Sequence, residues 1–275
     1  MKRKIAIQGV KGAFHEEAAI KIFGEEIEIA PCITFKELVE KIDRDEIELG
    51  IMAIENTISR TILDNLELIR QYKLQISAET YLRIKQNLAV VKGANFQTIR
   101  EVQSHYMALN QCRGYFEKYP SIHLVESADT ALSIKEVAEK GSLEYAAIGS
   151  KLAIEYYGLE MLAESIETNK ENYTRFVIVS KNPKVEAYYN KVSLTLTLPH
   201  QSGSLSKVLN LLHKLGVNLT KIESVPIEGQ PWEYRFYLDL IVPQIEDKDQ
   251  IIESLIAITD ELTVLGKYIS RTEER

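Results

Sequence analysis

The stretch KIAIQGVKGAFHEEAAIKIF, residues 4–23, contains the pattern that decides the fold of this chain. Its first five residues, Lys4 to Gln8, predict a strand, and two glycines in residues 9–12 then turn the chain. After the turn, apolar residues recur at helical spacing on one face: Phe14, Ala18, Ala19, Ile22 and Phe23. A strand, a turn and an amphipathic helix in this order predict an α/β fold with a mainly parallel sheet.

The same unit repeats along the first two thirds of the chain. Thr34 is a predicted helix N-cap with Glu37 as its capping-box partner, between predicted strands at 27–30 and 49–54. A second set begins near Tyr81, with strands at 87–91, 122–126 and 145–148 and helices at 107–119 and 129–140. With a returning strand at 176–180, we expect two α/β lobes in residues 1–182, the second at about 82–170, and a ligand cleft between them.

A different pattern follows the polar stretch 181–184, whose Pro183 marks the expected domain boundary. A predicted helix at 203–215 ends at Gly216, as a glycine C-cap would end it. The other predicted elements are strands at 192–198, 217–227, 232–242 and 263–270 and a helix at 249–262. This order, βαββαβ, predicts a ferredoxin-like domain over residues 190–271.

Composition excludes several classes of function. The net charge of -7 disfavours nucleic acid, because binding a phosphate backbone needs a clustered Lys/Arg surface. No run of 18 apolar residues predicts a membrane span, and residues 1–4 are not followed by the apolar segment of a signal peptide. Cys32 and Cys112 lack the spacing of a zinc or redox site. We therefore expect a cytoplasmic protein.

Two motifs of the first lobe carry groups that suit a small anionic ligand. The turn at 9–12 precedes a helix start, where free backbone N–H groups favour a carboxylate, although a plain strand-to-helix turn fits equally well. Asn56 follows a predicted strand, at the edge where α/β sheets bind ligands. Its neighbour Glu55 fits an acid, a base or a capping carboxylate.

Two further motifs supply hydroxyl groups beside other polar groups. Ser104 and His105 precede a predicted helix that contains Gln111. No carboxylate lies at a spacing that supports a Ser-His-Asp triad, and Ser104 as a helix cap stays an alternative. Thr174 stands beside Arg175, whose guanidinium suits a bidentate carboxylate contact, although the start of a surface strand is another interpretation.

Taken in order, these motifs resemble the prephenate dehydratase family over nearly the whole chain. The resemblance rests on Gly-x-x-Gly-x-Phe ending at Phe14, on Ile54-Glu55-Asn56, on Ser104-His105 with Gln111-Cys112, on Ser127, on residues 147–150, and on Thr174-Arg175-Phe176. It implies a two-lobed fold like that of periplasmic binding proteins. It also implies conversion of prephenate to phenylpyruvate, on the route to phenylalanine, with no metal or organic cofactor.

The resemblance also implies a role for each matching residue. Thr174 would lie nearest the leaving hydroxyl, with Asn56, Ser104 and Gln111 as neighbouring polar contacts. A neutral threonine is a poor acid, so we expect it to stabilise the departing oxygen by a hydrogen bond. Glu55 or His105 would supply the proton. The expected substrate contacts are Phe14, Glu55, His105, Ser127, Arg175 and Phe176.

The C-terminal domain resembles the ACT domain of the same family, in which two motifs bind phenylalanine. The matching positions, where we expect this effector to bind, are Gly203, Ser204, Leu205, Asn218, Leu219, Glu223 and Ser224. ACT domains pair, so the resemblance implies a homodimer or a homotetramer. The chain departs from the family at five places: Val225 replaces an Arg, His15 replaces a Ser, Thr57 replaces a Ser, Arg60 replaces a Gly, and Tyr106-Met107 replaces a Pro-Gln pair.

Two rival functions remain open on the sequence. An arogenate dehydratase differs only in the amino group of its substrate. A non-catalytic sensor, in which a two-lobed solute-binding fold works with an amino-acid-binding ACT domain, belongs to another class. The specific set of Asn56, Gln111, Thr174 and Arg175 argues against a sensor, and an assay of both substrates separates the two dehydratases.

Overall fold

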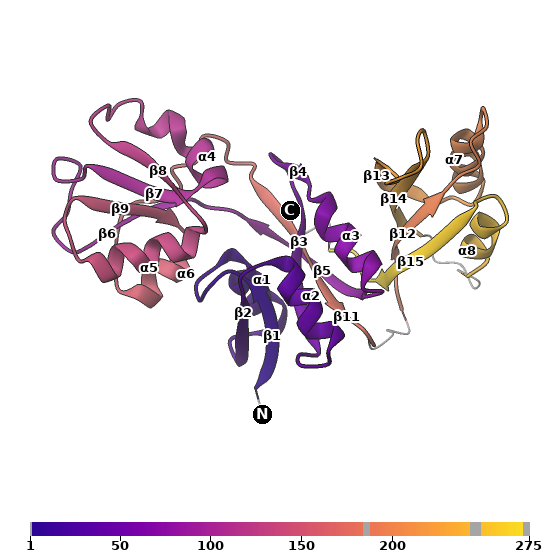
Figure 1. The fold of residues 1–275 in the computed structure, drawn as a ribbon, viewed down its shortest axis with the longest axis horizontal. Helices are drawn as coiled ribbons and strands as arrows, with labels where there is room; N and C mark the ends of the chain where they lie inside the picture. Colours follow the sequence, from indigo (N-terminus) through magenta and orange to yellow (C-terminus); the bar gives the residue numbers. More distant parts are fainter. Residues whose placement is uncertain (1, 184–187, 243–248, 272–275) are drawn as a thin grey trace. The chain divides into compact units, whose positions relative to one another are not determined.

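The computed structural model describes residues 2–183, 188–242 and 249–271, which form two compact units (Figure 1). Unit 1 contains residues 2–68 and 80–177, and unit 2 contains residues 69–79 and the described part of 178–271. Predictions that involve Met1 and Lys184 fall outside the described residues. No helix in the described ranges is long and apolar enough to cross a membrane.

The first sheet of unit 1 has the strand order β11, β3, β1, β2. Strand β1 runs parallel to both β2 and β3, and its Ile5, Ala6 and Ile7 are fully buried, as expected for a strand covered on both faces. The chain in this region forms β1 (Arg3–Gln8), α1 (Phe14–Phe23), β2 (Ile27–Cys32), α2 (Phe35–Asp43), β3 (Leu49–Asn56), β4 (Arg60–Thr61), α3 (Leu63–Gln71), β5 (Gln75–Arg83) and β11 (Tyr173–Ser180).

The second sheet of unit 1 has the order β10, β6, β9, β7, β8. Figure 1 shows α4 on one face of this sheet and α5 with α6 on the other. Strand β7 is parallel to β8 and β9, whereas β6 and β10 add antiparallel pairs. Its elements are β6 (Asn87–Val90), β7 (Glu101–His105), α4 (Tyr106–Phe116), β8 (His123–Ser127), α5 (Thr130–Lys140), β9 (Tyr145–Gly149), α6 (Lys151–Tyr157) and β10 (Glu160–Ala163).

Unit 2 has the βαββαβ order that the sequence predicts, with the sheet order β13, β14, β12, β15. All three of these strand pairs are antiparallel. Strand β15 also pairs in parallel with the first part of β5, at Gly266 and Ile76. The elements are β12 (Lys191–Thr197), α7 (Ser204–Lys214), β13 (Asn218–Pro226), β14 (Tyr234–Ile241), α8 (Asp249–Ile256) and β15 (Glu261–Tyr268).

The structure confirms the position of the predicted N-cap at Thr34 and of the predicted helix end at Gly216. The Thr34 hydroxyl accepts a hydrogen bond from the backbone N–H of Glu37 at 3.1 Å, and the Glu37 carboxylate accepts one from the N–H of Ile33 at 2.6 Å. In the expected capping box this carboxylate accepts from the N–H of the N-cap residue Thr34, whereas here it accepts from the residue before it. Gly216 lies just after α7 with a φ of 67°, a conformation that favours glycine, so the predicted helix end is confirmed.

Several predicted boundaries are wrong. The helix at 107–119 begins at Tyr106 and ends at Phe116, and the helix at 249–262 ends at Ile256. Leu262, placed in that helix, lies in β15. The strand at 232–242 begins at Tyr234 because Trp232 has a φ of 71° in a turn. The pattern also left β4, α3, β5, β7, α6 and β10 unassigned.

Candidate active site

Unit 1 contains a cavity of about 390 Å³ where elements of both its sheets end. Residues at the ends of β1, β3, β7 and β8 and at the start of β11 contribute to its wall, which is the usual location of ligand sites in α/β proteins. The lining residues are Gln8, Ala13, Phe14, His15, Ala53, Asn56, Ser59, Ile62, Ile84, Gln86, His105, Met107, Ala108, Gln111, Ala128, Asp129, Thr130, Thr174 and Phe176.

The electrostatics of this cavity come from backbone more than from charged side chains. Among the lining residues within the described chain there is no lysine or arginine. Three helices begin at the wall, because its lining includes residues at or just before the start of α1 (Ala13, Phe14, His15), of α4 (His105, Met107, Ala108) and of α5 (Ala128, Asp129, Thr130). Each helix N-terminus carries the equivalent of about half a positive charge. The cavity therefore suits carboxylate groups without a lysine or arginine at its surface.

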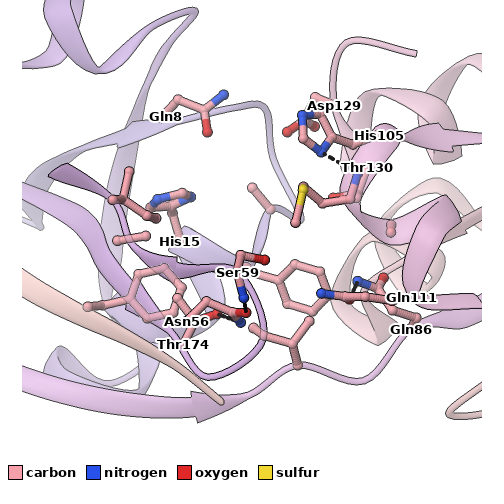
Figure 2. A pocket seen from close by; sticks show the side chains of 18 of the residues that line it. Gln8, His15, Asn56, Ser59, Gln86, His105, Gln111, Asp129, Thr130 and Thr174 are labelled. Carbon is pink, nitrogen blue, oxygen red and sulfur yellow. Dashed lines mark hydrogen bonds between the residues drawn. The ribbon is translucent and has the colours of Figure 1, made fainter. Parts of the chain in front are cut away.

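Thr174 and Asn56 lie side by side on one wall, as Figure 2 shows. The Asn56 amide nitrogen donates to the Thr174 hydroxyl at 2.9 Å and to the Asn172 side-chain oxygen at 2.8 Å. The Asn56 oxygen accepts from the backbone N–H groups of Ile58 and Ser59. Because Asn56 donates to the Thr174 oxygen, the Thr174 hydroxyl hydrogen is left to donate elsewhere.

Gln111, on helix α4, joins the same network. The Asn172 amide nitrogen donates to the Gln111 side-chain oxygen at 3.0 Å, and the Gln86 amide nitrogen donates to the same atom at 3.2 Å. The structure thus brings together three residues that the sequence predicts, Asn56, Gln111 and Thr174, although up to 118 positions separate them in the chain.

Three predicted substrate contacts also line the cavity, namely Phe14, His105 and Phe176. His105 is exposed and caps α4, since its Nδ1 accepts from the backbone N–H of Met107 at 3.3 Å. It lies beside Asp129, which is the N-cap of α5. Burial raises the pKa of the Asp129 carboxyl.

Four predicted site residues do not line this cavity. Ser104 is fully buried and donates to the backbone oxygen of Ile148 at 2.7 Å, and Ser127 ends β8 as a half-buried residue. Arg175 and Glu55 form an ion pair at 3.4 Å behind the wall, with 2% and 31% of their side chains exposed. The structure therefore gives Ser104 and the Glu55–Arg175 pair contacts within the protein, and their roles toward a ligand stay predictions.

The cavity also includes polar residues that sequence reasoning did not select as site residues, among them Gln8, His15, Gln86 and Asp129. The ring of His15 makes edge contacts with Phe35 and Phe176, and burial lowers its pKa to about 4, so the ring is neutral at pH 7. Gln8 could have been selected from the sequence, because it stands at the end of a predicted strand. No feature of the local sequence indicated that Gln86 is a site residue.

The described residues include no cluster of three or more His, Cys, Asp or Glu side chains that could hold a metal ion, and both cysteines are buried. Cys32 and Cys112 are buried free thiols, and burial raises the pKa of both. These thiols are therefore unreactive at neutral pH.

The residues predicted to bind an effector lie in unit 2. Gly203 caps α7 with a φ of 86°, and Ser204 and Leu205 form the first turn of that helix. The other four, Asn218, Leu219, Glu223 and Ser224, lie on β13. That strand has β14 as its one neighbour in the described sheet order, and alternate residues along it are exposed.

The fold and the cavity define a two-lobed α/β ligand-binding region, joined in one chain to a ferredoxin-like domain. Comparison with family models matches residues 5–184 to prephenate dehydratase and residues 192–260 to the ACT domain. Because the first match covers more than half of the chain, this protein belongs to the prephenate dehydratase family and carries an ACT domain.

Individual relatives agree with this assignment. The bifunctional chorismate mutase/prephenate dehydratase of Aquifex aeolicus is 30% identical over 97% of this chain and 74% of its own length. The arogenate dehydratase/prephenate dehydratase 2 of Arabidopsis thaliana, a chloroplast protein, is 31% identical over 96% of this chain and 72% of its own length.

Two solved structures have nearly the same fold. The prephenate dehydratase of Arthrobacter aurescens in complex with L-Phe has a TM-score of 0.87 and 26% identity, over 99% of this chain and 91% of that one. GqqA, described as a novel type of quorum-quenching acylase, has a TM-score of 0.89 and 28% identity, over 99% of this chain and 100% of that one.

Proposed function

We propose that this protein is a cytoplasmic lyase that converts prephenate to phenylpyruvate. The observation that carries the proposal is the family match over residues 5–184, in whose cavity Thr174, Asn56 and Gln111 form one hydrogen-bonded network. In this reaction the bond from the ring to its carboxyl group breaks and releases CO2. The electron pair enters the ring, and the hydroxyl leaves with its own pair and one proton as water.

The cavity offers a place for each part of this substrate. Prephenate is a dianion, and the three helix N-termini favour binding of its two carboxylates. Thr174 donates a hydrogen bond to the departing oxygen. Asn56 donates to the Thr174 oxygen, so the hydroxyl hydrogen of Thr174 is left for the substrate.

The structure favours one of the two proton donors that we expect. His105 lines the cavity, whereas Glu55 is paired with Arg175 outside the lining. We therefore propose that His105, which lines the cavity beside Asp129, delivers the proton, a role in which its Nδ1 releases the N–H of Met107. Arg175 then acts on the site through Glu55 and through its neighbour Thr174.

The test is turnover of the purified full chain with prephenate and with arogenate, following phenylpyruvate and phenylalanine by mass. We expect phenylpyruvate from prephenate and loss of this activity in Thr174→Ala. Faster turnover of arogenate would replace the proposal by the arogenate dehydratase function. Binding of prephenate without turnover of either substrate would favour the sensor.

GqqA provides a second function to test, because its acylase activity would act on an amide. In this chain the one hydrogen bond described for the Thr174 hydroxyl comes from an amide, Asn56, rather than from an imidazole or carboxylate base. An unactivated hydroxyl is a weak nucleophile. We therefore expect no hydrolysis of an acyl amide above background at enzyme concentrations that turn over prephenate.

We also propose that residues 1–182 hold the catalytic activity and residues 190–271 the regulatory domain. One consequence of the fold affects the test. Unit 2 includes residues 69–79, where Glu79 forms a buried ion pair with Lys191. A fragment ending at residue 182 leaves Glu79 without its partner, so we compare it with the same fragment carrying Glu79→Gln. Activity in this folded fragment supports the division, and a folded but inert fragment contradicts it.

Phenylalanine is the effector that we propose for the ACT domain, at a site between two subunits of a homodimer or homotetramer. The N-terminus of α7 would hold the carboxylate, and Glu223 the ammonium group. Prephenate and phenylalanine must then weaken each other's binding by the same factor.

Calorimetry with phenylalanine tests this effector site. Gly203→Val strains a residue with a φ of 86°, and Gly229→Val strains one with a φ of 76° in the turn between β13 and β14. An added Cβ meets nothing within 4 Å at either position, so the second variant is a matched control. We expect only Gly203→Val to abolish binding, and no heat for the wild type at millimolar phenylalanine would contradict the proposal.

A further inference from the structure

Asn172 lies at the centre of the polar network of unit 1, immediately before β11, and it is fully buried. Its backbone oxygen accepts from the N–H of Ile84 at 2.7 Å, which fixes the main chain at this point. Its side chain bonds to Asn56 on one side and to Gln111 on the other, at 2.8 and 3.0 Å. Both of these partners line the cavity, whereas Asn172 does not. It therefore links two cavity residues without reaching a ligand itself.

The amide orientations in this network are fixed by the backbone. The Asn56 oxygen accepts from two backbone N–H groups, at 2.9 and 2.8 Å, so the Asn56 nitrogen must face Asn172. The Asn172 oxygen is then the acceptor, and its nitrogen donates to the Gln111 oxygen. The Gln86 nitrogen donates to that same oxygen at 3.2 Å. A reversed Gln111 amide would place its nitrogen against the nitrogen of Asn172, so the oxygen faces the network.

The Gln111 nitrogen is consequently free to bond to a ligand. It has no hydrogen-bond partner among the described residues, and it is not one of the buried polar atoms that lack a partner. It therefore keeps accessible surface, and Gln111 lies on the wall of the cavity (Figure 2). At the other end of the network, Thr174 also has a hydrogen left to donate. The network thus offers the cavity a donor at each end, which suits the oxygens of an anionic ligand.

We propose that Asn172 is a positioning residue, which holds the Gln111 amide so that its N–H donates to an oxygen of the substrate. This inference rests on the function proposed above. The two carboxylates and the ketone of prephenate only accept hydrogen bonds, so a donor at this position favours binding and an acceptor opposes it. The two ends of an amide have nearly the same shape, so hydrogen bonds rather than packing select which end faces the cavity.

A double-mutant cycle on prephenate turnover tests this role. Gln111→Met removes the amide at the same length, and kcat/KM should fall about 10- to 100-fold, as for a lost hydrogen bond to a charged group. Asn172→Ala should lower kcat/KM about 10-fold, because the Gln111 amide then keeps only Gln86 as a partner and can turn. Once the amide is absent there is nothing to orient, so adding Asn172→Ala to Gln111→Met should change kcat/KM by less than about twofold.

Asn87→Ala is the matched control for loss of a buried asparagine. Asn87 is 1% exposed and also belongs to unit 1, but it bonds to backbone groups and does not line the cavity. Its partners are the backbone atoms of Lys85, Gly149 and Ser165. We expect this variant to lose stability and to leave kcat/KM unchanged at temperatures below its unfolding midpoint.

Gln111→Glu tests the direction of the hydrogen bond and does not depend on the folding of Asn172→Ala. One carboxylate oxygen still accepts from Asn172 and Gln86, and the other takes the place of the N–H. We expect kcat/KM to be lower than in Gln111→Met. Gln8→Glu adds the same charge elsewhere on the lining, so it measures the effect of charge alone, which we expect to be smaller.

Three results would overturn the inference. Losses that multiply in the double variant would mean that Asn172 acts independently of Gln111, as a merely structural residue does. A Gln111→Glu variant more active than Gln111→Met would mean that the cavity needs an acceptor at this position. Wild-type kcat/KM in Asn172→Ala would mean that Gln111 needs no orienting partner. An inactive wild type would instead remove the proposed function itself, and this result is distinct from the others because it needs no variant.

Discussion

Each unit of the molecule holds a chain of buried polar groups, and the two chains differ in charge. In unit 1 the network of Asn56, Asn172, Gln111 and Gln86 consists of neutral amides. In unit 2 the network is ionic. Lys191 donates to both oxygens of Glu79, at 3.1 and 2.9 Å, with 2% and 0% of the two side chains exposed.

The ionic network of unit 2 extends on both sides of this pair. Glu79 also accepts from the backbone N–H of Arg271. On β12, Ser193 bonds to Asp239 of β14 and to the Tyr268 hydroxyl of β15. The pair therefore connects β5 with β12, so that residues 69–79 belong to unit 2 although they stand in the middle of the N-terminal sequence.

The difference between the networks indicates their roles. Buried charges must be paired, because the desolvation of an unpaired ion costs several kcal/mol. The ionic network accordingly stabilises the packing of β5 with β12. The neutral network contains one buried acceptor without a donor among the described residues, the Gln86 oxygen, at a cost of about 1–3 kcal/mol. Breaking the first network should affect stability, and breaking the second should affect catalysis.

The largest expected effect is that of Lys191→Met on stability. It removes the cation that pairs with the buried Glu79 carboxylate, and the loss of one partner of a buried pair costs about 3–5 kcal/mol. Urea unfolding measures the change. Adding Glu79→Leu should recover most of the loss, because both charges are then absent. A single variant as stable as the wild type would show that the pair contributes nothing to folding.

Thr174→Ala should have the largest effect on catalysis and little on stability. Loss of a hydrogen-bond donor to the leaving oxygen is expected to lower kcat about 10²- to 10³-fold, with a much smaller change in KM. Arg175→Ala should chiefly raise KM, because it releases Glu55 and disturbs the adjacent wall. Steady-state kinetics with prephenate provide the measurement, and Thr220→Ala in unit 2 is the control. Equally small effects of both variants would show that neither Thr174 nor Arg175 belongs to the active site.

Glu17 tests whether unit 1 keeps its buried groups neutral. Burial raises the pKa of the Glu17 carboxyl from 4.5 to about 7. Between these two pKa values the folded state binds a proton that the unfolded state has released. The free energy of unfolding therefore falls by up to about 3 kcal/mol as the pH rises from about 4.5 to 7, and it is level above that range.

Glu17→Gln should abolish this pH dependence, because the amide does not titrate. Unfolding of both proteins at pH 5 and pH 8 checks it, with the exposed Glu25→Gln as the control. If the two proteins lose equal stability between these pH values, Glu17 is not the titrating group.

The smallest expected effect is that of Thr34→Ala, at the N-terminus of α2. It removes the acceptor of the Glu37 N–H, and loss of such a cap costs about 1 kcal/mol. Neither network contains this residue, so kinetic constants should not change. Thermal unfolding gives the stability, and a shift in kcat would mean that α2 affects the cavity.

Much of the fold was accessible from local pattern. The strand-turn-helix at 4–23, the cap at Thr34 and the helix end at Gly216 depend on side-chain spacing and on backbone conformations that few residues adopt. The family motifs also pointed to Asn56, Gln111 and Thr174 before their contacts were known. Pattern did not place the end of the helix at 249–262, because apolar residues continue past Ile256 into β15.

What the sequence determined by itself is therefore most of the elements, the order of the domains and the residues with reactive side chains. Tertiary structure alone decided which polar groups meet. Glu79 and Lys191 are 112 positions apart, and Gln86 is ordinary in its local sequence. Its unpaired oxygen results from an amide relay through Asn56, Asn172 and Gln111, residues brought together by long-range packing. Hydrogen bonding depends on distance and direction in space, and sequence spacing fixes these only within one helix or strand.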